Sequence, residues 1–334
     1  MNARTRWLPL VVSAMLAVAF TEAYAEGDSG FRVLSWNVSE DSFVKQRDSF
    51  AGVLQKADPD ILLFDEVTPN TKESELRSVL EGLPLADGET WHIDIGVSGG
   101  RQRGAIIARA PLLSLQEFSS IVPYPDADRQ HILRSMSDAE RRYSAYSMDF
   151  GIPVNGALVL QGGRRLLVLI VDLQCCGASA ESWQEYRRRV EAREIRELVR
   201  KVLDREKVDG IVIAGDFNAV NSTIPVTRLL GPYAAPHSGM IPAEVYHQDG
   251  ARTWTWDGRG TPFPSSALDY QLYSPGGLRA ANGLVIDTED LPAAERQAYG
   301  LENSTSRRLS EHRPLLVDYT WHPAPPEVAK ENAQ

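Results

Sequence analysis

Polar side chains stand where the apolar, strand-like segments of this 334-residue chain end. In α/β sandwiches the ends of neighbouring strands converge on one cleft, so polar residues far apart in the sequence can assemble into one site. The sequence therefore predicts a single shared polar site. The residues at these ends are Asn37, Glu66, Asp216 and Asn218, with Glu311 and His312 directly before the last such segment.

The types of these residues fit the hydrolysis of a phosphate ester assisted by a divalent cation. Carboxylate and amide oxygens suit Mg²⁺, which typically takes one or two protein carboxylates plus the phosphate of the substrate. A carboxylate can position or deprotonate the attacking water, and a histidine can stabilise charge on a phosphoryl oxygen. Asp269 could hold the imidazole of His312 in one tautomer and raise its basicity.

Each of these residues, taken singly, also has an ordinary structural interpretation. A carboxylate at a strand end is usually part of a turn or a helix cap. We interpret the histidines that have no motif around them as surface or hydrogen-bonded residues; these are His92, His131, His237, His247 and His322. Only the combination of polar residues favours a catalytic site.

Strand-like and helical segments alternate along the chain, with no internal repeat and no linker, which predicts one α/β domain over residues 26–322. We expect helices over residues 43–57 and 181–206. The expected strands cover residues 31–36, 61–64, 104–108, 157–160, 166–173, 211–214, 253–256, 268–273 and 315–319.

Three further segments have predictions of their own. The run from Arg187 to Arg189 is interpreted as a solvated helix face. Residues 121–145 are polar and rich in Arg and Asp, which predicts a long loop or insertion of the kind that often determines substrate specificity. Trp254 and Trp256 alternate with threonines, which indicates core positions on a strand.

The N-terminus has the pattern of a cleaved export signal. Arg4 and Arg6 precede an apolar run over residues 8–20, and Ala23-Tyr24-Ala25 fits a signal peptidase site, so residues 1–25 are predicted to be removed after Ala25. The alternative is a membrane anchor, but the run is shorter than the roughly 20 residues that span a bilayer. We expect a periplasmic or secreted protein with no stable membrane anchor and a disordered C-terminal tail over residues 323–334.

Composition and cysteine count limit the remaining function classes. The net charge of −10 shows that the surface as a whole is not built to capture polyanions, although a local basic cleft remains open. The two cysteines, Cys175 and Cys176, are adjacent, which excludes a disulfide framework. A strained vicinal disulfide, a free pair and a pairing with another chain all remain alternatives.

Five strings occur in the order found in the endonuclease/exonuclease/phosphatase superfamily, and the sequence resembles that superfamily over residues 31–320. The superfamily includes DNase I-like nucleases, apurinic endonucleases, neutral sphingomyelinases and inositol-polyphosphate 5-phosphatases. The resemblance implies an α/β, four-layer sandwich of two packed mixed β-sheets flanked by helices. The strings are Ser35-Trp36-Asn37-Val38, Asp60 to Glu66, Gly215-Asp216-Phe217-Asn218, Leu268-Asp269-Tyr270 and Ser310 to Pro314.

The resemblance also implies roles for the matching residues. Glu66 would be the principal Mg²⁺ ligand, with Asn37 beside it, and Mn²⁺ or Ca²⁺ are alternatives to Mg²⁺. Glu311 stands where the family usually has Asp and would reach the metal directly or through a water.

The catalytic roles carry over in the same way. Asp216 would orient or deprotonate the attacking water, and Asn218 would help to hold the phosphate. His312 would contact the scissile phosphate, with Asp269 as its partner.

This sequence departs from the family pattern at several positions. Asp172, in the string Ile170-Val171-Asp172-Leu173, occupies a catalytic position where many members carry His, and it is either a second metal ligand or a sign that the substrate sits differently. Ser39 stands where apurinic endonucleases often have an acidic residue, and Asp65 where many members have Gln. Gln271 replaces the common Ile, which we expect to be harmless.

Three functional hypotheses follow. The first is an exported phosphodiesterase, nuclease-like by default, whose phosphate-ester substrate is nucleic acid. The second is a phosphatase or phospholipase of the sphingomyelinase or inositol-phosphatase type, and the third is a non-catalytic binding protein on the same fold. Arginines that could bind the substrate phosphates, or be ordinary surface charges, are Arg103 and Arg142, together with Arg101, Arg134, Arg141 and Arg164.

Overall fold

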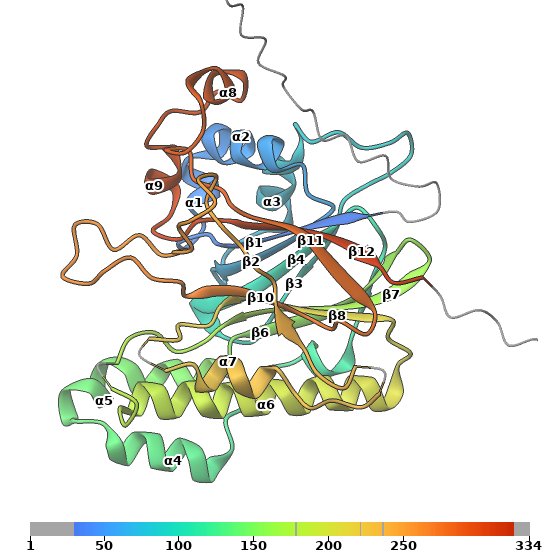
Figure 1. Cartoon of the computed structure of the whole chain (residues 1–334). Helices are drawn as coiled ribbons and strands as arrows, with labels where there is room; N and C mark the ends of the chain where they lie inside the picture. The colour runs from blue at the N-terminus through green and yellow to red at the C-terminus, as the bar shows by residue number, and fades with distance from the viewer. Residues whose placement is uncertain (1–29, 178, 221, 236, 324–334) are drawn as a thin grey trace, which may run out of the picture.

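Two six-stranded β-sheets pack face to face, and helices cover the outer face of each sheet (Figure 1). The computed structural model describes residues 30–177, 179–220, 222–235 and 237–323. The architecture confirms the predicted four-layer α/β sandwich. The predicted signal peptide and residues 324–334 of the predicted tail lie outside the described residues. Within the described part of the chain, no helix is long and apolar enough to cross a membrane.

The first sheet is mixed, because β1 and β2 run parallel whereas their other neighbours are antiparallel. In spatial order its strands are β11 (Leu278–Val285), β12 (Leu315–Trp321), β1 (Phe31–Asn37), β2 (Ile61–Val67), β4 (Arg103–Ala108) and β3 (His92–Ile95).

The second sheet is built in the same way around the parallel pair β7 and β8. In spatial order its strands are β5 (Leu112–Ser114), β6 (Val154–Gln161), β7 (Arg164–Asp172), β8 (Gly210–Asp216), β10 (Asp269–Tyr273) and β9 (Ile241–Pro242). In each sheet, therefore, a central pair of parallel strands ends at the same edge.

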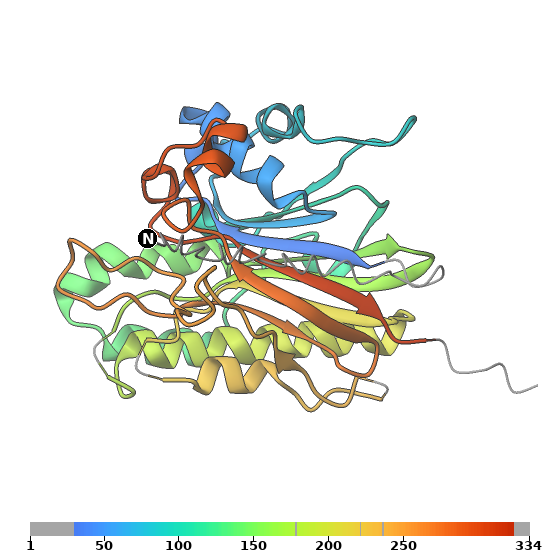
Figure 2. The same cartoon turned by 45° about the horizontal axis from the view of Figure 1, so that its top comes forward.

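Helices form the two outer layers, as the view in Figure 2 also shows. The first sheet carries α1 (Ser42–Lys45), α2 (Arg47–Ala57), α3 (Glu73–Leu80), α8 (Ala293–Ala298) and α9 (Thr305–Leu309). The second sheet carries α4 (Asp126–Ser135), α5 (Asp138–Ser144), α6 (Trp183–Arg205) and α7 (Ile224–Leu229). Three 3₁₀ turns complete the described elements: η1 (Gly100–Gln102), η2 (Gln116–Phe118) and η3 (Ala145–Phe150).

Side chains alternate between the helical layer and the layer between the sheets, because successive residues of a strand point to opposite faces. Along β7, Leu167 and Leu169 belong to the core under α6, whereas Val168 and Ile170 belong to the core between the sheets. The same alternation holds along the other central strands, so the last residue of several of them faces the opposite sheet.

Three sequence interpretations are wrong. Residues 253–256 form no extended strand, and only Trp256 makes isolated bridges, while Trp254 and Trp256 are half-buried. Residues 121–145 contain the helices α4 and α5 instead of a long loop. Arg187 and Arg188 are buried, since their guanidinium groups pair with the carboxylates of Glu191 and Glu185 at 2.9 Å and 3.0 Å.

One buried glutamine joins the two sheets through hydrogen bonds. Gln271 on β10 donates from its Nε2 to the carbonyl oxygens of Val33 at 3.1 Å and Leu315 at 3.0 Å, both in the first sheet. The same Nε2 lies 3.2 Å from the Oγ of Ser35, and the hydroxyl of Tyr319 donates to the Oε1 at 3.2 Å. The Gln271 amide therefore fixes the spacing of the sheets close to their polar end.

We predict that Gln271→Leu lowers the free energy of unfolding by about 1–3 kcal/mol, because the Ser35 and Tyr319 hydroxyls lose a buried partner. Urea unfolding followed by fluorescence measures the change. The control is Gln297→Leu on the exposed side of α8, which should unfold like the wild type. Equal stability of the two variants would show that the Gln271 hydrogen bonds contribute no net stability.

Candidate active site

The apolar layer between the sheets ends in a layer of polar side chains at the carboxyl ends of the parallel strands, on the left of Figure 1. Asn37 pairs in register with Asp65 in the first sheet. In the second sheet Asp216 pairs with Asp172 on one side and with Asp269 on the other. All five residues lie on the inter-sheet face by the alternation described above, and all five are buried.

His312 lies between two of these carboxylates. Its Nδ1 is 2.8 Å from the Oδ2 of Asp269, and its Nε2 is 3.6 Å from the Oδ2 of Asp216. Burial by itself lowers the pKa of His312, but the two carboxylates outweigh this effect and raise the pKa to about 10. Burial raises the pKa of Asp216 to about 8, although His312 opposes the rise. At neutral pH His312 is therefore an imidazolium in contact with acidic partners.

Neighbouring hydroxyl groups hold this constellation in place. The Oγ1 of Thr255 donates to the Oδ2 of Asp269 at 2.6 Å. The Oγ of Ser310 donates to the carbonyl of Asn37 at 2.8 Å and accepts the backbone N–H of His312 at 2.9 Å. Ser310 thus ties the His312 segment to the end of β1.

Glu66 and Asn37 form a second group in the site. The Nδ2 of Asn37 donates to the Oε1 of Glu66 at 3.0 Å. The pairing of β2 with β4 shifts register between Phe64 and Val67, and Glu66 has a left-handed φ of 56°. Bulges and unusual backbone angles of this kind re-aim side chains and recur at functional sites. The bulge turns Glu66 out of the strand alternation and into the rim of the site.

Asn218 is positioned by the turn that follows β8. Its backbone N–H donates to the Oδ1 of Asp216 at 2.8 Å, and its Nδ2 donates to the carbonyl of Leu173 at 2.9 Å. The turn requires Gly215, where φ is 125° and a Cβ would lie 2.0 Å from the carbonyl oxygen of Val171. The Gly-Asp-Phe-Asn string therefore places Asp216 and Asn218 side by side.

Two buried carboxylates at this end have unpartnered oxygens. Among the described residues, neither carboxylate oxygen of Asp65 has a hydrogen-bond partner, and the Oδ2 of Asp172 has none either. Burial, reinforced by neighbouring carboxylates, raises the pKa of both groups well above the usual range. The Oδ1 of Asp172 lies 3.5 Å from the Nδ2 of Asn218. Such orphaned acids need either a proton or a cation.

The donor set fits a hard divalent cation. Glu66, Asn37 and the unpartnered oxygens of Asp65 supply the oxygen ligands that Mg²⁺, Mn²⁺ and Ca²⁺ prefer. Within the described ranges, the ligand atoms of Asp216, Asp269 and His312 also lie within 4.8 Å of one another. Because His312 already shares a hydrogen bond with Asp269, these three residues are better suited to moving and holding protons.

The remaining predicted site residues are placed differently. Glu311 is exposed, and its Oε2 accepts the Nε1–H of Trp256 at 3.3 Å. Arg103 donates to the carbonyl of Thr68, just after Glu66, and burial lowers its pKa. Arg142 is exposed on α5. Their predicted roles in metal and substrate binding stay predictions.

Sequence reasoning missed two residues that hold the site together and one that faces into it. Asp65 could have been found by extending the alternation of β2 by one step, since Ile61 and Leu63 face the other sheet. Thr255 and Gln102, whose side-chain amide opposes the burial-driven rise in the pKa of Asp172, come from segments outside the regular helices and strands. Irregular segments lack a periodic pattern, so no sequence signal could have identified those two.

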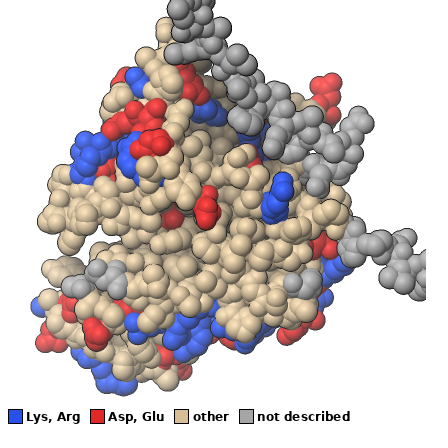
Figure 3. All heavy atoms as spheres, in the orientation of Figure 1, with Lys and Arg blue, Asp and Glu red and all other residues tan. Residues whose placement is uncertain are grey.

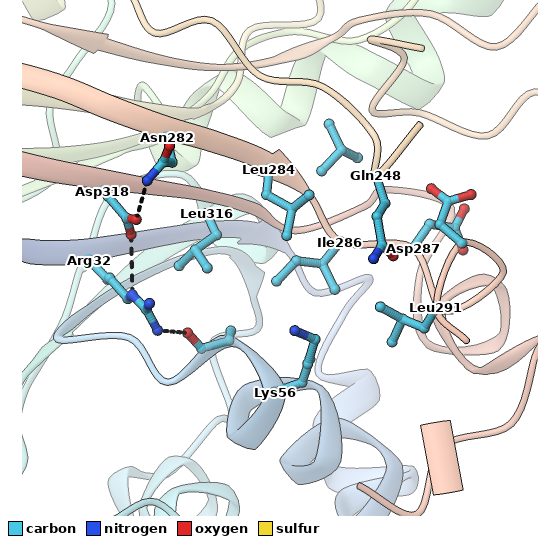
Figure 4. A pocket seen from close by; sticks show the side chains of 13 residues that line it. Arg32, Lys56, Gln248, Asn282, Leu284, Ile286, Asp287, Leu291, Leu316 and Asp318 are labelled. Atoms are coloured by element: carbon cyan, nitrogen blue, oxygen red, sulfur yellow. Dashed lines mark hydrogen bonds and ion pairs between the residues drawn. The ribbon is translucent and has the colours of Figure 1, made fainter. Parts of the chain in front are cut away.

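A pocket of about 190 Å³ lies away from these residues, near the outer face of the first sheet (Figure 4). Its charged side chains already pair with neighbouring residues: Arg32 with Asp318 at 3.2 Å, and Lys56 with Glu295 at 2.7 Å. None of the predicted site residues lines this pocket. We therefore place the chemistry at the strand ends.

A DNase I-like sandwich with a buried acid–histidine cluster at its strand ends defines a hydrolase of phosphate esters. The comparisons agree: the model of the endonuclease/exonuclease/phosphatase family matches residues 34–312, and the chain belongs to this family. Enzymes of this family are metal-dependent phosphoester hydrolases, which confirms the predicted enzyme class. A search of curated proteins finds no match.

Solved structures of the same fold share little sequence with this chain. Truncated TDP2 from Caenorhabditis elegans is 14% identical, with a TM-score of 0.54, over 88% of this chain and 98% of that one. A family member from Beutenbergia cavernae is 16% identical, with a TM-score of 0.53, over 89% and 72%. ANGEL2, a 2′,3′-cyclic phosphatase, is 16% identical, with a TM-score of 0.53, over 88% and 95%. These likenesses establish the fold.

We predict that Asp65→Asn stabilises the metal-free protein at pH 8 by about 1–3 kcal/mol. The pKa of Asp65 is higher in the folded chain than in the unfolded chain, so the folded state binds more protons. The contribution of Asp65 to stability is therefore fully present below the unfolded value of about 4 and is lost as pH rises above it. Asp65→Asn should flatten this fall, as measured by thermal unfolding in EDTA between pH 5 and pH 9.

Asp204→Asn, on the exposed face of α6, is the matched control and should keep the wild-type pH profile. If the unfolding temperature of the wild type in EDTA does not fall as the pH is raised, the proposal that ionised Asp65 destabilises the metal-free protein is wrong.

Proposed function

We propose that the chain is an exported, Mg²⁺-dependent phosphodiesterase that acts on single-stranded nucleic acid. The observation that carries the proposal is the His312–Asp269 hydrogen bond with Asp216 on the other side of the ring, next to the Glu66–Asn37 pair. Export is supported by the signal-like pattern of residues 1–25.

The residues divide the reaction between them. Asp216 can accept the proton of the attacking water in its ionised form, which its pKa of about 8 places in mildly alkaline solution. The His312 imidazolium can donate to a phosphoryl oxygen, while Asp269 holds the ring through Nδ1. Mg²⁺ held by Glu66 and Asn37 would stabilise the negative charge that develops on the phosphate.

The surface charge argues for a short or single-stranded substrate. Acidic and basic side chains are interspersed over the face shown in Figure 3, and its middle is mostly uncharged. The chain carries a net charge of −10. Long duplexes are usually captured by broad basic surfaces, which this face does not offer.

Exposed aromatic side chains offer an alternative way to hold nucleotides. Tyr146 and Phe150 on η3 are 58% and 45% exposed and lie edge to face, with ring centroids 6.3 Å apart. Such rings can stack on nucleobases without reading sequence, which is how many proteins bind single strands.

The turn η1 connects this aromatic pair to the active site. Phe150 packs on Gly100, where a Cβ would meet the ring at 2.9 Å. Arg101 pairs with Glu40, three residues after Asn37, and the side-chain amide of Gln102 opposes the burial-driven rise in the pKa of Asp172. A nucleotide next to the scissile phosphate could therefore reach Tyr146 and Phe150.

One structural neighbour supports the same substrate class. TDP2 from D. rerio, 16% identical with a TM-score of 0.50, has been crystallised with a single-strand DNA product. The alternative that an observation favours is a phosphatase for cyclic or terminal phosphates, since ANGEL2 is a 2′,3′-cyclic phosphatase.

The proposal predicts hydrolysis of bis-p-nitrophenyl phosphate and a single-stranded oligonucleotide with Mg²⁺, and none in EDTA. Sphingomyelin vesicles and a nucleoside 2′,3′-cyclic phosphate test the other substrate classes. Glu66→Gln should raise the Mg²⁺ concentration for half-maximal rate at least about tenfold, and His312→Gln should lower the rate about 10²- to 10⁴-fold.

The control is Glu181→Gln, an exposed carboxylate that should leave both quantities unchanged. The absence of turnover of every ester with Mg²⁺, Mn²⁺ or Ca²⁺ would contradict the proposed activity. A Glu66→Gln variant with unchanged Mg²⁺ dependence would contradict the metal assignment alone.

We further predict that Tyr146→Ala raises KM for the oligonucleotide about tenfold, because one base–aromatic stack is worth about 1–3 kcal/mol. Tyr146→Phe should restore the wild-type KM, since the ring is kept. Bis-p-nitrophenyl phosphate is too small to occupy the active site and η3 together, so its KM should not change. If only hydrolysis of sphingomyelin vesicles responds to Tyr146→Ala, the substrate is a lipid and the nucleic-acid proposal is wrong.

A further inference from the structure

The adjacent cysteines lie on the loop that leaves the active site. Cys175 and Cys176 follow the end of β7 at Asp172, and both are exposed. Their Sγ atoms are 2.8 Å apart and share a hydrogen bond. Neighbouring side chains of an extended chain point to opposite sides, so this contact needs a special backbone. Cys176 supplies it, with a left-handed φ of 70°.

Buried charges of α6 hold this loop in shape. The Nη1 of Arg188 donates to the carbonyl oxygens of Gln174 and Cys176, each at 2.7 Å. The carboxylate of Glu191 accepts the backbone N–H of Gln174 at 2.8 Å. Arg188 and Glu191 are themselves fully buried. The peptide groups before Cys175 and after Cys176 are thus fixed to one rigid helix, which keeps the two thiols together.

The two thiols are chemically unequal. The hydrogen bond shared with Cys175 and the nearby Arg188 guanidinium lower the pKa of Cys176 to about 6, against the effect of burial. The same hydrogen bond, with burial, raises the pKa of Cys175. An exposed thiolate next to a second thiol is the arrangement found at reactive cysteine pairs.

We propose that Cys175 and Cys176 form a reversible dithiol–disulfide site that reacts with disulfide oxidants. The Cys176 thiolate attacks one sulfur of the oxidant, forms a mixed disulfide and releases the first thiolate. The Cys175 thiol then loses its proton and attacks the Sγ of Cys176, which releases the second thiolate. Two protein thiols and one disulfide become one protein disulfide and two thiols, so two electrons pass to the oxidant.

The ring that results is strained, which makes the reaction reversible. The Cα atoms of adjacent residues are about 3.8 Å apart across a trans peptide. The Cα atoms of two cysteines joined by a disulfide are usually roughly 4.4–6.8 Å apart. Strained and exposed disulfides have more oxidising potentials and are the ones that exchange in cells. We therefore expect a low-molecular-weight thiol such as glutathione to reduce the pair.

Oxidation reaches the active site through the preceding residue. The backbone N–H of Leu173 donates to the carbonyl of Asp216 at 2.8 Å, and the Leu173 carbonyl accepts the Nδ2 of Asn218 at 2.9 Å. Leu173 lies two residues before Cys175, so a backbone shift on ring closure would move its carbonyl and disturb the alignment of Asn218 and Asp172. The oxidised protein should hydrolyse phosphate esters more slowly than the reduced protein, an effect that rests on the proposed function.

The experiment equilibrates the purified protein in buffers of reduced and oxidised glutathione, quenches it with acid and alkylates the remaining thiols. Mass spectrometry of the peptide that contains both cysteines should show the loss of two hydrogens in the oxidised buffer and double alkylation in the reduced one. Cys175→Ser should stop at a glutathione adduct on Cys176. Cys176→Ser should react with alkylating agents far more slowly at pH 7 than Cys175→Ser.

Activity measured on the same samples separates the two parts of the inference. The rate of hydrolysis of bis-p-nitrophenyl phosphate should fall at least threefold on oxidation, which corresponds to roughly 0.7 kcal/mol of activation free energy. The rate should recover when dithiothreitol is added. The variant with both Cys175→Ser and Cys176→Ser should be active and insensitive to glutathione. Double alkylation in excess oxidised glutathione, or only disulfides between chains, would overturn the dithiol site whatever the activity. Oxidation without any change in rate would overturn only its link to catalysis.

Discussion

The whole site depends on where the apolar layer between the two sheets ends. Val33, Val168 and Val212 fill that layer, and the strands that carry them end in polar residues on the same face. Because side chains alternate along a strand, these polar residues must face each other across the gap between the sheets. Water is excluded there, so each carboxyl group is held in a low-dielectric space where its partners decide its charge.

The balance of charge in that space is strongly acidic. Asp269, Asp216 and Asp65 act on the His312 imidazole, and Asp172 and Glu66 lie near these carboxyl groups. Asp65 and Asp172 replace the neutral or basic residues of the family pattern, and they are the acids whose oxygens lack partners among the described residues. The fold keeps these buried carboxyl groups close together, which favours the binding of protons or cations. Such clusters lower the stability of the folded protein, as is common at functional sites.

The outer helix α6 contributes more than a cover for the second sheet. Its buried arginines pair with glutamates of the same helix, and the Nη1 of Arg188 donates to the loop after β7. Arg187 likewise donates to the hydroxyl of Tyr124 at 2.9 Å, which anchors the segment before α4. Buried ion pairs contribute little net stability, but their hydrogen bonds fix local geometry. Here they fix the backbone next to Asp172 and the cysteine pair.

The sequence by itself determined the central strands of both sheets, their order and the polar residues at their ends, but not the edge strands β3, β5, β9 and β11. It could do so because apolar periodicity is local and because Gly215-Asp216-Phe217-Asn218 requires a particular turn. The family motifs extended this to the sandwich of two sheets, and the structure confirms that architecture.

The tertiary structure alone decided how those residues meet. The burial of Arg187 and Arg188 could not be predicted, because the pattern of α6 treats arginine as a solvent-facing residue. Thr255 became a partner of Asp269 only through a long-range fold, and Glu311 lies against Trp256 for the same reason. His312 and Asp269 are 43 positions apart, and their hydrogen bond exists because two separate sheets bring their ends together. Local periodicity specifies which face a side chain occupies, whereas the partner that sets its charge comes from the packing of distant segments.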